Sequence, residues 1–342
     1  MTLFHPIKSR AGRALIGAFA LATSLSSAAD ADTVLRFATL QSPQNPMIVE
    51  LNKAFDEVKE KTDGRVAFQV SYGKESGFSS KQFLTALEAG LLDGALISTS
   101  AMSSDYHWTG VYGLPLLLPD AGFRRPIVEA AKPRLAAFAE TKGVVPLAYP
   151  IHMDRWMVIY ATRDMQSLAD TKGMLIRTYD AATKAIAEAL GGVPTSMAKS
   201  EVYMGLQRGT IDGAITGDTS AEAMHMDEVA PFILRYDTVF LPHILGVSEK
   251  AWSKVSPEDR ETVNAIFKTW EEGYWAKLDE RDASDSAFDY AREHGMKVID
   301  PSPEIAAKLE AVGKSMAEEF AAVDDESRAA YEEVRQVIDK GL

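Results

Sequence analysis

The stretches "LEAGLLDGAL", residues 87–96, and "LQRGTIDGAI", residues 206–215, carry Leu, Gly, Asp, Gly and Ala at matching positions. In both copies the apolar residues that precede the first glycine fall at helical spacing. Gly90 and Gly209 predict the ends of these helices, because glycine readily adopts the left-handed conformation that closes a helix. The Asp-Gly pair that follows predicts a turn into a short buried strand. A chance match between two common modules is the alternative, and the sequence around the copies argues against it.

Both copies occupy the same step of a longer pattern. In the first half, the strand-like runs "TVLRFATL" and "RVAFQVSYG" flank a helical run from Met47 to Thr62, and the first copy follows. In the second half, "GMLIRTY" and "VPTSM" flank the helical run "DAATKAIAEALGG", and the second copy follows. Each half has the order β-α-β-α-β, so we predict two similar α/β lobes.

The first 31 residues have the features of a secretory signal peptide. Lys8, Arg10 and Arg13 precede the apolar run "ALIGAFALA", and small residues lead to "ADA". That run is too short to span a membrane, so we expect a mature chain that is soluble in the periplasm. The absence of cysteine argues against a lipid-anchored receptor and a disulfide scaffold. The net charge of -13 argues against nucleic-acid binding.

Each repeat ends in a strand that runs into small polar residues. "STSAMSS" begins at Ser98 and includes Ser100, and "TGDTSAE" begins at Thr216 and includes Asp218. In open parallel sheets, ligands bind beyond the carboxyl ends of the strands. We therefore expect these side chains near a ligand held between the lobes, with an ordinary loop composition as the alternative.

A long helix is expected after the second lobe. Ser256 is a typical N-cap, and Pro257 suits the first helical turn. Because only Gly273 interrupts the run before Gly295, we predict a helix of roughly forty residues that lies across both lobes. Its apolar stripe comprises Val263, Ile266, Trp270, Tyr274 and Leu278. "SPEIAAKLEAVGKSMAEEFAAV" and "DESRAAYEEVRQVI" predict two shorter amphipathic helices at the C-terminus.

Several segments resemble one protein family along nearly the whole mature chain. "SLADTKGMLIRT", "GGVPTSMAKSEVYMGLQRGTIDG" and the region of "LRFATLQSPQNP" are similar to the substrate-binding proteins of tripartite ATP-independent periplasmic (TRAP) transporters, of the dicarboxylate-receptor type. The resemblance implies an α/β periplasmic-binding-protein clamshell with two lobes, hinge strands and a long helix that spans both lobes. It also implies a periplasmic receptor without a cofactor or metal, which passes a small organic acid to the small and large permease subunits of an ion-driven transporter.

The resemblance and the predicted elements together give the domain limits. The signal peptide comprises residues 1–31. Lobe I comprises residues 32–154 and 243–282, and lobe II comprises residues 155–242 and 283–342.

Arg177 in "KGMLIR" matches the family arginine that binds the ligand carboxylate. The position also has a physical reason, because a guanidinium at the end of an apolar strand offers a planar charged fork that grips a carboxylate with two hydrogen bonds. A structural arginine paired with Asp180 or another acid is the alternative. Arg155 in "HMDRW" matches a second family arginine.

Two positions depart from the family pattern and leave the ligand open. Thr216 stands where the family usually has asparagine, so it offers one hydroxyl in place of an amide. Lys199 stands where the family places a stacking phenylalanine, and it adds a cation unless it points to solvent. Four-carbon dicarboxylates, sugar acids, hydroxy or keto acids and aromatic acids all remain compatible with the sequence.

The first lobe is expected to contribute weaker contacts to the ligand. The candidates are Gln41, Ser42, Asn45, Phe78, Ser98 and Ser100. Trp108 and Trp156 are candidates for an apolar wall, with a place in the core as the alternative.

The chain offers no recognisable reaction centre. It lacks the GxSxG, HExxH, P-loop and GxGxxG motifs, and the histidines beyond the signal segment have no metal-ligand spacing. We therefore expect a binding protein and not an enzyme. A receptor for an ATP-driven importer and a periplasmic sensor lobe share the clamshell, and the neighbouring genes would distinguish them from a TRAP receptor.

Overall fold

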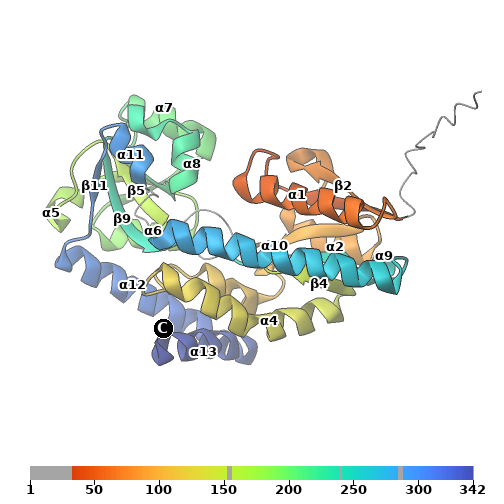
Figure 1. Ribbon diagram of the computed structural model, residues 1–342. Helices are drawn as coiled ribbons and strands as arrows, with labels where there is room; N and C mark the ends of the chain where they lie inside the picture. The colour runs from red at the N-terminus through yellow and green to blue at the C-terminus, as the bar shows by residue number, and fades with distance from the viewer. Residues whose placement is uncertain (1–32, 152–155, 239–240, 284–287, 342) are drawn as a thin grey trace, which may run out of the picture. The chain divides into compact units, whose positions relative to one another are not determined.

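Two β-sheets with flanking helices make up the part of the chain that the structure describes. The computed structural model describes residues 33–151, 156–238, 241–283 and 288–341 (Figure 1). The expected signal peptide lies outside the described residues.

The repeat predicted from the sequence is present in both halves. The first half contains β1 (Thr33–Thr39), α1 (Pro46–Lys61), β2 (Val66–Tyr72), α2 (Phe83–Glu88) and β3 (Gly94–Ser98). The second half contains β6 (Leu175–Thr178), α6 (Ala181–Ala189), β7 (Val193–Ser196), α7 (Val202–Gln207) and β8 (Gly213–Gly217). The predicted β-α-β-α-β order is therefore confirmed twice.

The two sheets have the same strand order, although each takes strands from both halves of the chain. The first sheet runs β2-β1-β3-β10-β4, and the second runs β7-β6-β8-β5-β9-β11. In each sheet an antiparallel strand follows the three parallel strands of the repeat, β10 in the first sheet and β5 in the second. The added strands are β4 (Val144–Ala148), β5 (Trp156–Ala161), β9 (Phe232–Thr238), β10 (His243–Ser248) and β11 (Lys297–Ile299). The chain thus crosses between the sheets three times: at two short segments, from β4 to β5 and from β9 to β10, and at one long segment from β10 to β11.

Glycines end the repeated helices and allow close packing of the strands that follow. Gly90 and Gly209 have φ angles of 71° and 68°, which confirms the predicted left-handed helix ends. Gly94 has a different reason to be glycine, because a Cβ atom there would lie 2.8 Å from the ring of Phe37. The second glycine of the first copy therefore lets β3 approach β1, and it does not make the turn.

The long helix α10 (Pro257–Ala283) is shorter than the sequence led us to expect. It begins at Pro257 as predicted, but it has 27 residues, and α11 (Asp289–Glu293) is a separate helix. The prediction of roughly forty residues was therefore wrong.

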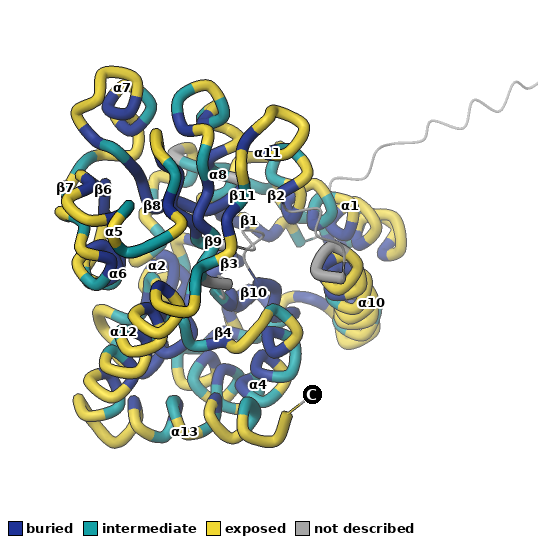
Figure 2. The backbone as a smooth tube through the Cα atoms, turned by 90° about the vertical axis from the view of Figure 1, so that its left-hand side faces the viewer, coloured by how far each residue is buried: buried dark blue, intermediate teal, exposed yellow. Residues whose placement is uncertain are grey.

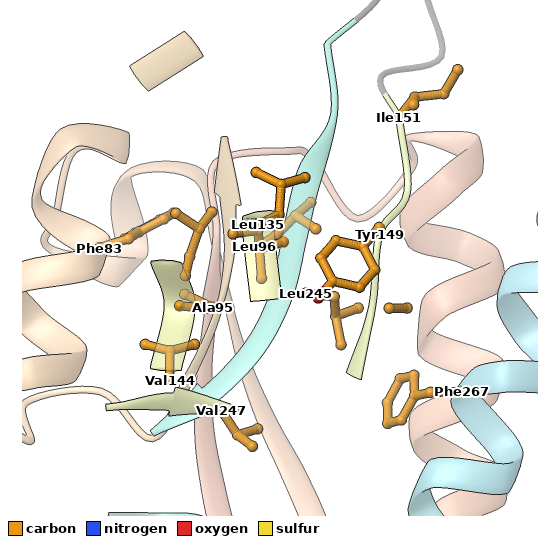
Figure 3. Packing of buried hydrophobic residues seen from close by; sticks show 14 of the residues in the cluster. Phe83, Ala95, Leu96, Leu135, Val144, Tyr149, Ile151, Leu245, Val247 and Phe267 are labelled. Atoms are coloured by element: carbon orange, nitrogen blue, oxygen red, sulfur yellow. The ribbon is translucent and has the colours of Figure 1, made fainter. Parts of the chain in front are cut away.

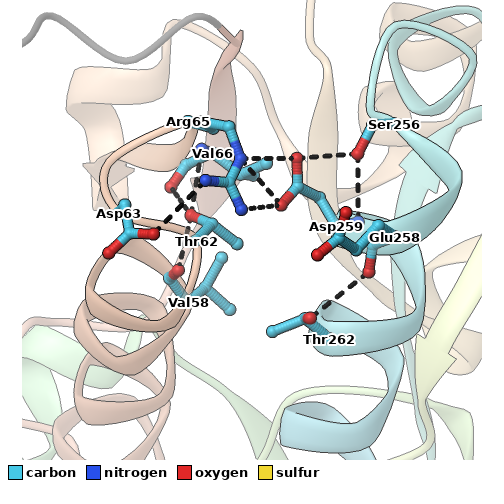
Figure 4. A network of polar contacts seen from close by, with 9 residues as sticks. All are labelled: Val58, Thr62, Asp63, Arg65, Val66, Ser256, Glu258, Asp259 and Thr262. Carbon is cyan, nitrogen blue, oxygen red and sulfur yellow. Dashed lines mark hydrogen bonds and ion pairs between the residues drawn. The ribbon is translucent and has the colours of Figure 1, made fainter.

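An ion pair and an apolar stripe fix α10 on the first sheet's side. Arg65, just before β2, donates from Nη2 to Oδ1 of Asp259 at 2.8 Å (Figure 4). Ser256 accepts the backbone N–H of Asp259 at 3.1 Å, as its predicted role of N-cap requires. The predicted stripe packs in the first core cluster, where α10 contacts α1 and β4.

Three apolar clusters hold the sheets and helices together. The largest belongs to the first sheet and includes Phe83, Leu96 and Phe267 (Figure 3). On the second sheet, Val158 and Ile159 of β5 fall in different clusters, because successive side chains of a strand point to opposite faces. Figure 2 shows the strands mostly buried and the outer turns of the helices exposed. The remaining helices described are α3 (Thr99–Met102), α4 (Arg124–Thr141), α5 (Leu168–Thr171), α8 (Asp218–Ala223) and α9 (Glu249–Trp252).

The two predicted C-terminal helices, α12 (Pro303–Ala321) and α13 (Asp325–Lys340), join both parts of the core. Ile305 of α12 lies in a cluster of the second sheet, and Phe320 lies in the cluster of the first. α13 contacts α4 on the first sheet's side. The domain limits stay a proposal, and these contacts favour moving α13 from lobe II, residues 283–342, to lobe I.

Candidate functional site

The carboxyl ends of the parallel strands in the second sheet bring several candidate residues together. β6 ends with Arg177 and Thr178, and β8 ends with Thr216 and Gly217. The start of β5 lies against the same end, because Met157 pairs with Gly217. This end of an open α/β sheet is where ligands commonly bind.

Arg177 is held in place by its neighbouring strands. It is 6% exposed. Its Nε–H donates to the carbonyl oxygen of Met197 at 3.0 Å, and its Nη1 donates to the carbonyl oxygen of Ile215 at 3.2 Å. The first carbonyl follows β7 and the second belongs to β8. These two bonds use two of the five guanidinium N–H groups, so the fork is oriented but not exhausted.

The charge of Arg177 has no described acidic partner. Among the described residues, no carboxylate lies within ion-pair distance of the guanidinium. Asp180, the partner considered from the sequence, caps α6, and its Oδ1 accepts the backbone N–H of Thr183 at 2.8 Å. Burial lowers the pKa of Arg177, and the charges of Tyr179 and Asp180 oppose only part of this effect. The side chain stays cationic at neutral pH.

Three other predicted residues lie in the same lobe. Thr216 and Asp218 are each 6% exposed, at the end of β8 and the start of α8. Lys199 is exposed, and its Nζ donates to Oγ of Ser220 at 3.0 Å. It lines a separate pocket of about 590 Å³ with Ser200, Tyr203 and Met224.

A second group of predicted residues meets in a pocket at the carboxyl end of the first sheet. Gln41, Ser98 and Ser100 line this pocket, which has a volume of about 210 Å³. The Oγ atoms of Ser98 and Ser100 form a hydrogen bond of 2.9 Å. The pocket's other polar lining residues are Thr39, Ser80 and His243. We call it the first-lobe pocket.

Other candidates of the first lobe do not line this pocket. Asn45 caps α1, and its Oδ1 accepts the backbone N–H of Met47 at 3.0 Å. Phe78 is half-buried against the first core cluster, and Ser42 is exposed. Trp108 is buried in that core, which matches the alternative to a place in an apolar wall.

Two further candidates, Arg155 and Trp156, stand next to each other in the sequence. Arg155 lies outside the described residues. Trp156 begins β5 and pairs with Thr238 at the end of β9. Trp156 lies on the edge that carries Arg177, because its neighbour Met157 pairs with Gly217 at the end of β8.

Some residues at these two edges were not predicted from the sequence. The guanidinium of Arg177 lies over the ring of Tyr179, 5.0 Å from the ring centre. Spacing of two along a strand was the available signal, because such residues share a face. Thr39 lies two residues before Gln41 and Ser80 two residues after Phe78, so proximity in sequence was the signal for them. His243 carried no such signal, because β10 reaches β3 from a distant part of the chain.

The described ranges contain neither a cluster of metal-binding side chains nor a helix suited to crossing a membrane. In residues 33–151, 156–238, 241–283 and 288–341, no three His, Cys, Asp or Glu side chains are grouped so that they could hold a metal ion. None of the helices in these ranges combines the length and the apolar character needed to cross a bilayer.

Comparison of the sequence with known proteins points to one family. Residues 37–324 match the model described as bacterial extracellular solute-binding protein, family 7. The C4-dicarboxylate-binding periplasmic protein DctP of Rhodobacter capsulatus is a relative with 27% identity over 329 residues, which cover 94% of this chain and 90% of the relative.

Solved structures of similar fold include TRAP periplasmic solute-binding proteins. A TRAP periplasmic solute-binding protein from Ochrobactrum anthropi, with its C-terminus bound in the ligand-binding pocket, has a TM-score of 0.77 and 21% identity, over 91% of this chain and 97% of that chain. One from Sulfitobacter sp. NAS-14.1 with bound β-D-galacturonate has a TM-score of 0.71 and 22% identity, over 89% of this chain and 100% of that chain. These similarities confirm the predicted fold class, a two-lobed α/β clamshell.

Proposed function

The chain belongs to family 7 of the bacterial extracellular solute-binding proteins, and from this we propose that it is the solute receptor of a TRAP transporter and binds a small organic carboxylate through Arg177. Its partners are then the small and large permease subunits, and its place is the periplasm. Two similar proteins support the ligand class, since one is named for C4-dicarboxylate binding and the other holds galacturonate.

The observation that carries this proposal is the buried and oriented charge of Arg177. Moving a cation out of water costs free energy unless an anion compensates it. Asp180 compensates this cation only in part, because its carboxylate caps α6 and forms no ion pair with Arg177. The carbonyl oxygens of Met197 and Ile215 orient the guanidinium but leave its net charge unbalanced. A ligand carboxylate supplies the missing charge and two acceptor oxygens that match the remaining fork.

Binding is then expected to draw the two lobes together. Two of the three crossings between the sheets are short segments, and rotation about these two changes the separation of the carboxyl edges without breaking either sheet. Closing around the ligand excludes water and strengthens the ion pair with Arg177. Because the ligand then binds the closed form more tightly, it shifts the population toward that form. The permease subunits would then recognise this closed form.

We also propose that the chain catalyses no reaction and releases its ligand unchanged. Incubation of the purified protein with a bound acid, followed by mass spectrometry, is expected to return the acid intact. A converted product would favour the enzyme alternative.

Calorimetry on the mature protein tests the role of Arg177. We expect Arg177→Ala to weaken carboxylate binding by roughly 100-fold or more, since it removes a buried charge-assisted bond pair. Arg177→Lys keeps the charge but loses the fork, so it should recover only part of the affinity. Arg208→Ala is the control, because Arg208 is exposed at the end of α7. Unchanged affinity in a folded Arg177→Ala variant would refute the assignment.

A further inference from the structure

The first-lobe pocket has a polar lining without a fixed positive charge. Five of its described lining residues carry hydroxyl or amide groups, namely Thr39, Gln41, Ser80, Ser98 and Ser100. The lining contains His243 but no described arginine or lysine. The Nδ1 of His243 lies 3.0 Å from the carbonyl oxygen of Leu241, which can only accept a hydrogen bond. Leu40, Phe83, Leu96 and Leu241 complete the described lining with apolar surface.

This lining matches neutral hydroxyl groups better than a carboxylate. A hydroxyl both donates and accepts, as do the serine, threonine and glutamine side chains that line the pocket. A carboxylate only accepts, and it loses its hydration when it enters the pocket. Because the described lining holds no lysine or arginine, it provides no ion pair to offset that loss.

The pocket lies on the edge of the first sheet that is joined to the Arg177 edge. His243 pairs with Ser98, the last residue of β3. Thr238 pairs with Trp156, and the neighbouring Met157 pairs with Gly217 at the end of β8. Thr238 therefore lies on the carboxyl edge of the second sheet. Only five Cα–Cα steps separate Thr238 from His243, so these two points lie at most about 19 Å apart. A ligand that is anchored on one edge can therefore reach the other when the lobes close.

The size of the pocket fits part of a ligand. Its volume of about 210 Å³ is below the roughly 300 to 1,000 Å³ of complete ligand pockets. The pocket is therefore suited to the tail of a molecule whose head is held elsewhere.

We infer that the ligand is a polyhydroxylated monocarboxylate, with its carboxylate on Arg177 and its hydroxyl-bearing tail in the first-lobe pocket. The inference rests on the proposed function and narrows its ligand class. It disfavours C4-dicarboxylates as the preferred cargo, because their far end would place a second negative charge in a pocket whose described lining has no lysine or arginine.

A matched set of acids tests the inference by thermal shift and calorimetry. The four-carbon set comprises threonate, tartrate, succinate and butyrate, and the six-carbon set comprises galactonate, galactarate, adipate and hexanoate. Each set varies the hydroxyl groups and the second carboxylate independently. For the chain length that the site accepts, we expect the hydroxylated monoacid, threonate or galactonate, to bind at least about ten-fold more tightly than the other three acids of its set. A diacid that binds as tightly or more tightly would overturn the inference but leave the proposed function standing. If no acid binds, both fail.

Variants of the pocket provide a second readout. The double variant Ser98→Ala with Ser100→Ala should weaken binding of the hydroxylated monoacid by roughly ten-fold and leave the unsubstituted monoacid unchanged. Ser100→Lys adds a cation and should shift preference toward the diacids. Ser104→Ala is the control, because Ser104 is exposed and does not line the pocket. Equal loss for both monoacids in the double variant would contradict the placement of the hydroxyl tail.

Discussion

Asp93 and Asp212, the aspartates of the two repeat copies, perform the same task in the two sheets. Asp93 Oδ2 accepts the backbone N–H of Arg36 in β1 at 3.1 Å, and the N–H of Asp93 donates to the carbonyl oxygen of Arg36 at 2.9 Å. Asp212 Oδ2 accepts the backbone N–H of Leu175 in β6 at 2.9 Å, and its own N–H donates back at 2.8 Å. Each aspartate therefore joins the third strand of its repeat to the first.

Removing these carboxylates should destabilise the fold to different degrees. We expect Asp93→Ala to lower the free energy of unfolding by about 2 kcal/mol and Asp212→Ala by about 1 kcal/mol, because each leaves a strand N–H without its acceptor. Asp93 matters more because its carboxylate also pairs with the side chain of Arg36 at 2.7 Å. Urea denaturation measures both. Asp105→Ala, at an exposed position, should change stability by less than about 0.5 kcal/mol. Equal effects in all three variants would contradict the shared role.

Some site residues could be predicted from the sequence because their positions depend on residues nearby in the chain. Arg177, Thr216 and Ser98 stand at the ends of strands that the hydrophobic pattern marks, so their edge positions followed from local rules. That no described acid forms an ion pair with Arg177 did not follow from the sequence, because it depends on Asp180 capping the start of α6. Membership of His243 in the first-lobe pocket depends on a long-range strand pairing, which periodicity does not reveal.

Among the helices, α10 holds one of the two short segments that cross between the sheets. Glu271 Oε1 accepts the backbone N–H of Tyr149 at 2.8 Å, and the hydroxyl of Tyr274 donates to the carbonyl oxygen of Ile151 at 2.7 Å. Lys132 of α4 pairs with Glu271 at 3.2 Å. Tyr149 and Ile151 lie between β4 and β5, so α10 fixes the chain where it leaves the first sheet.

Loss of the Tyr274 hydroxyl should loosen this anchor. We expect Tyr274→Phe to lower the free energy of unfolding by about 1 kcal/mol, because the buried carbonyl of Ile151 loses its donor. Amide exchange at Tyr149 and Ile151 should also become faster. Tyr331→Phe on α13 is the matched control, because Tyr331 is also part-buried against the first core cluster. Unchanged exchange in Tyr274→Phe would show that the helix does not hold this segment.

The ion pair at the start of α10 should make the stability of the protein depend on pH. Hydrogen bonds from Arg65 are the main reason that the pKa of Asp259 lies below its ordinary value of 3.8, and burial opposes them in part. A carboxylate whose pKa falls on folding stabilises the native state above that ordinary value, and this contribution disappears as the pH drops through the lowered value.

Asp259→Asn is therefore expected to cost about 1 kcal/mol at neutral pH, and its difference from the wild type should shrink below about pH 4. Denaturation at several pH values measures this difference. Glu258→Gln changes an exposed neighbouring acid and serves as the control. A difference that grows on acidification would reverse the assigned sign.

The arrangement of the two sheets shows how far local patterns predict this fold. The repeat predicted three strands in each sheet, and both orders, β2-β1-β3 and β7-β6-β8, confirm that the copies are equivalent. The fourth strand of each sheet, β10 or β5, was not predicted by its residues, because it joins a sheet whose other strands lie far away in sequence. Without those strands, the sequence cannot show which edges the crossing segments connect.

The exchange of strands has a consequence for motion of the whole protein. The two short crossing segments connect the carboxyl edge of one sheet to that of the other, and Ile151 of one forms a β-bridge with Pro242 of the other. Rotation about this paired connection changes the separation of the edges while each core stays packed. An anion on Arg177 that also reaches the first-lobe pocket would favour the smaller separation.

Small-angle scattering on the mature protein should detect this closure. We expect a saturating acid that binds tightly to decrease the radius of gyration, because the ligand contacts both edges only when they approach each other. Arg177→Ala should remain at the unliganded value in the same acid, since its anchor is missing. The double variant Ser98→Ala with Ser100→Ala should bind more weakly and close only at higher acid concentration. A wild-type radius that stays constant while calorimetry reports full occupancy would mean that the ligand is held by one lobe alone, and the proposed closing mechanism would then fail even with Arg177 as the anchor.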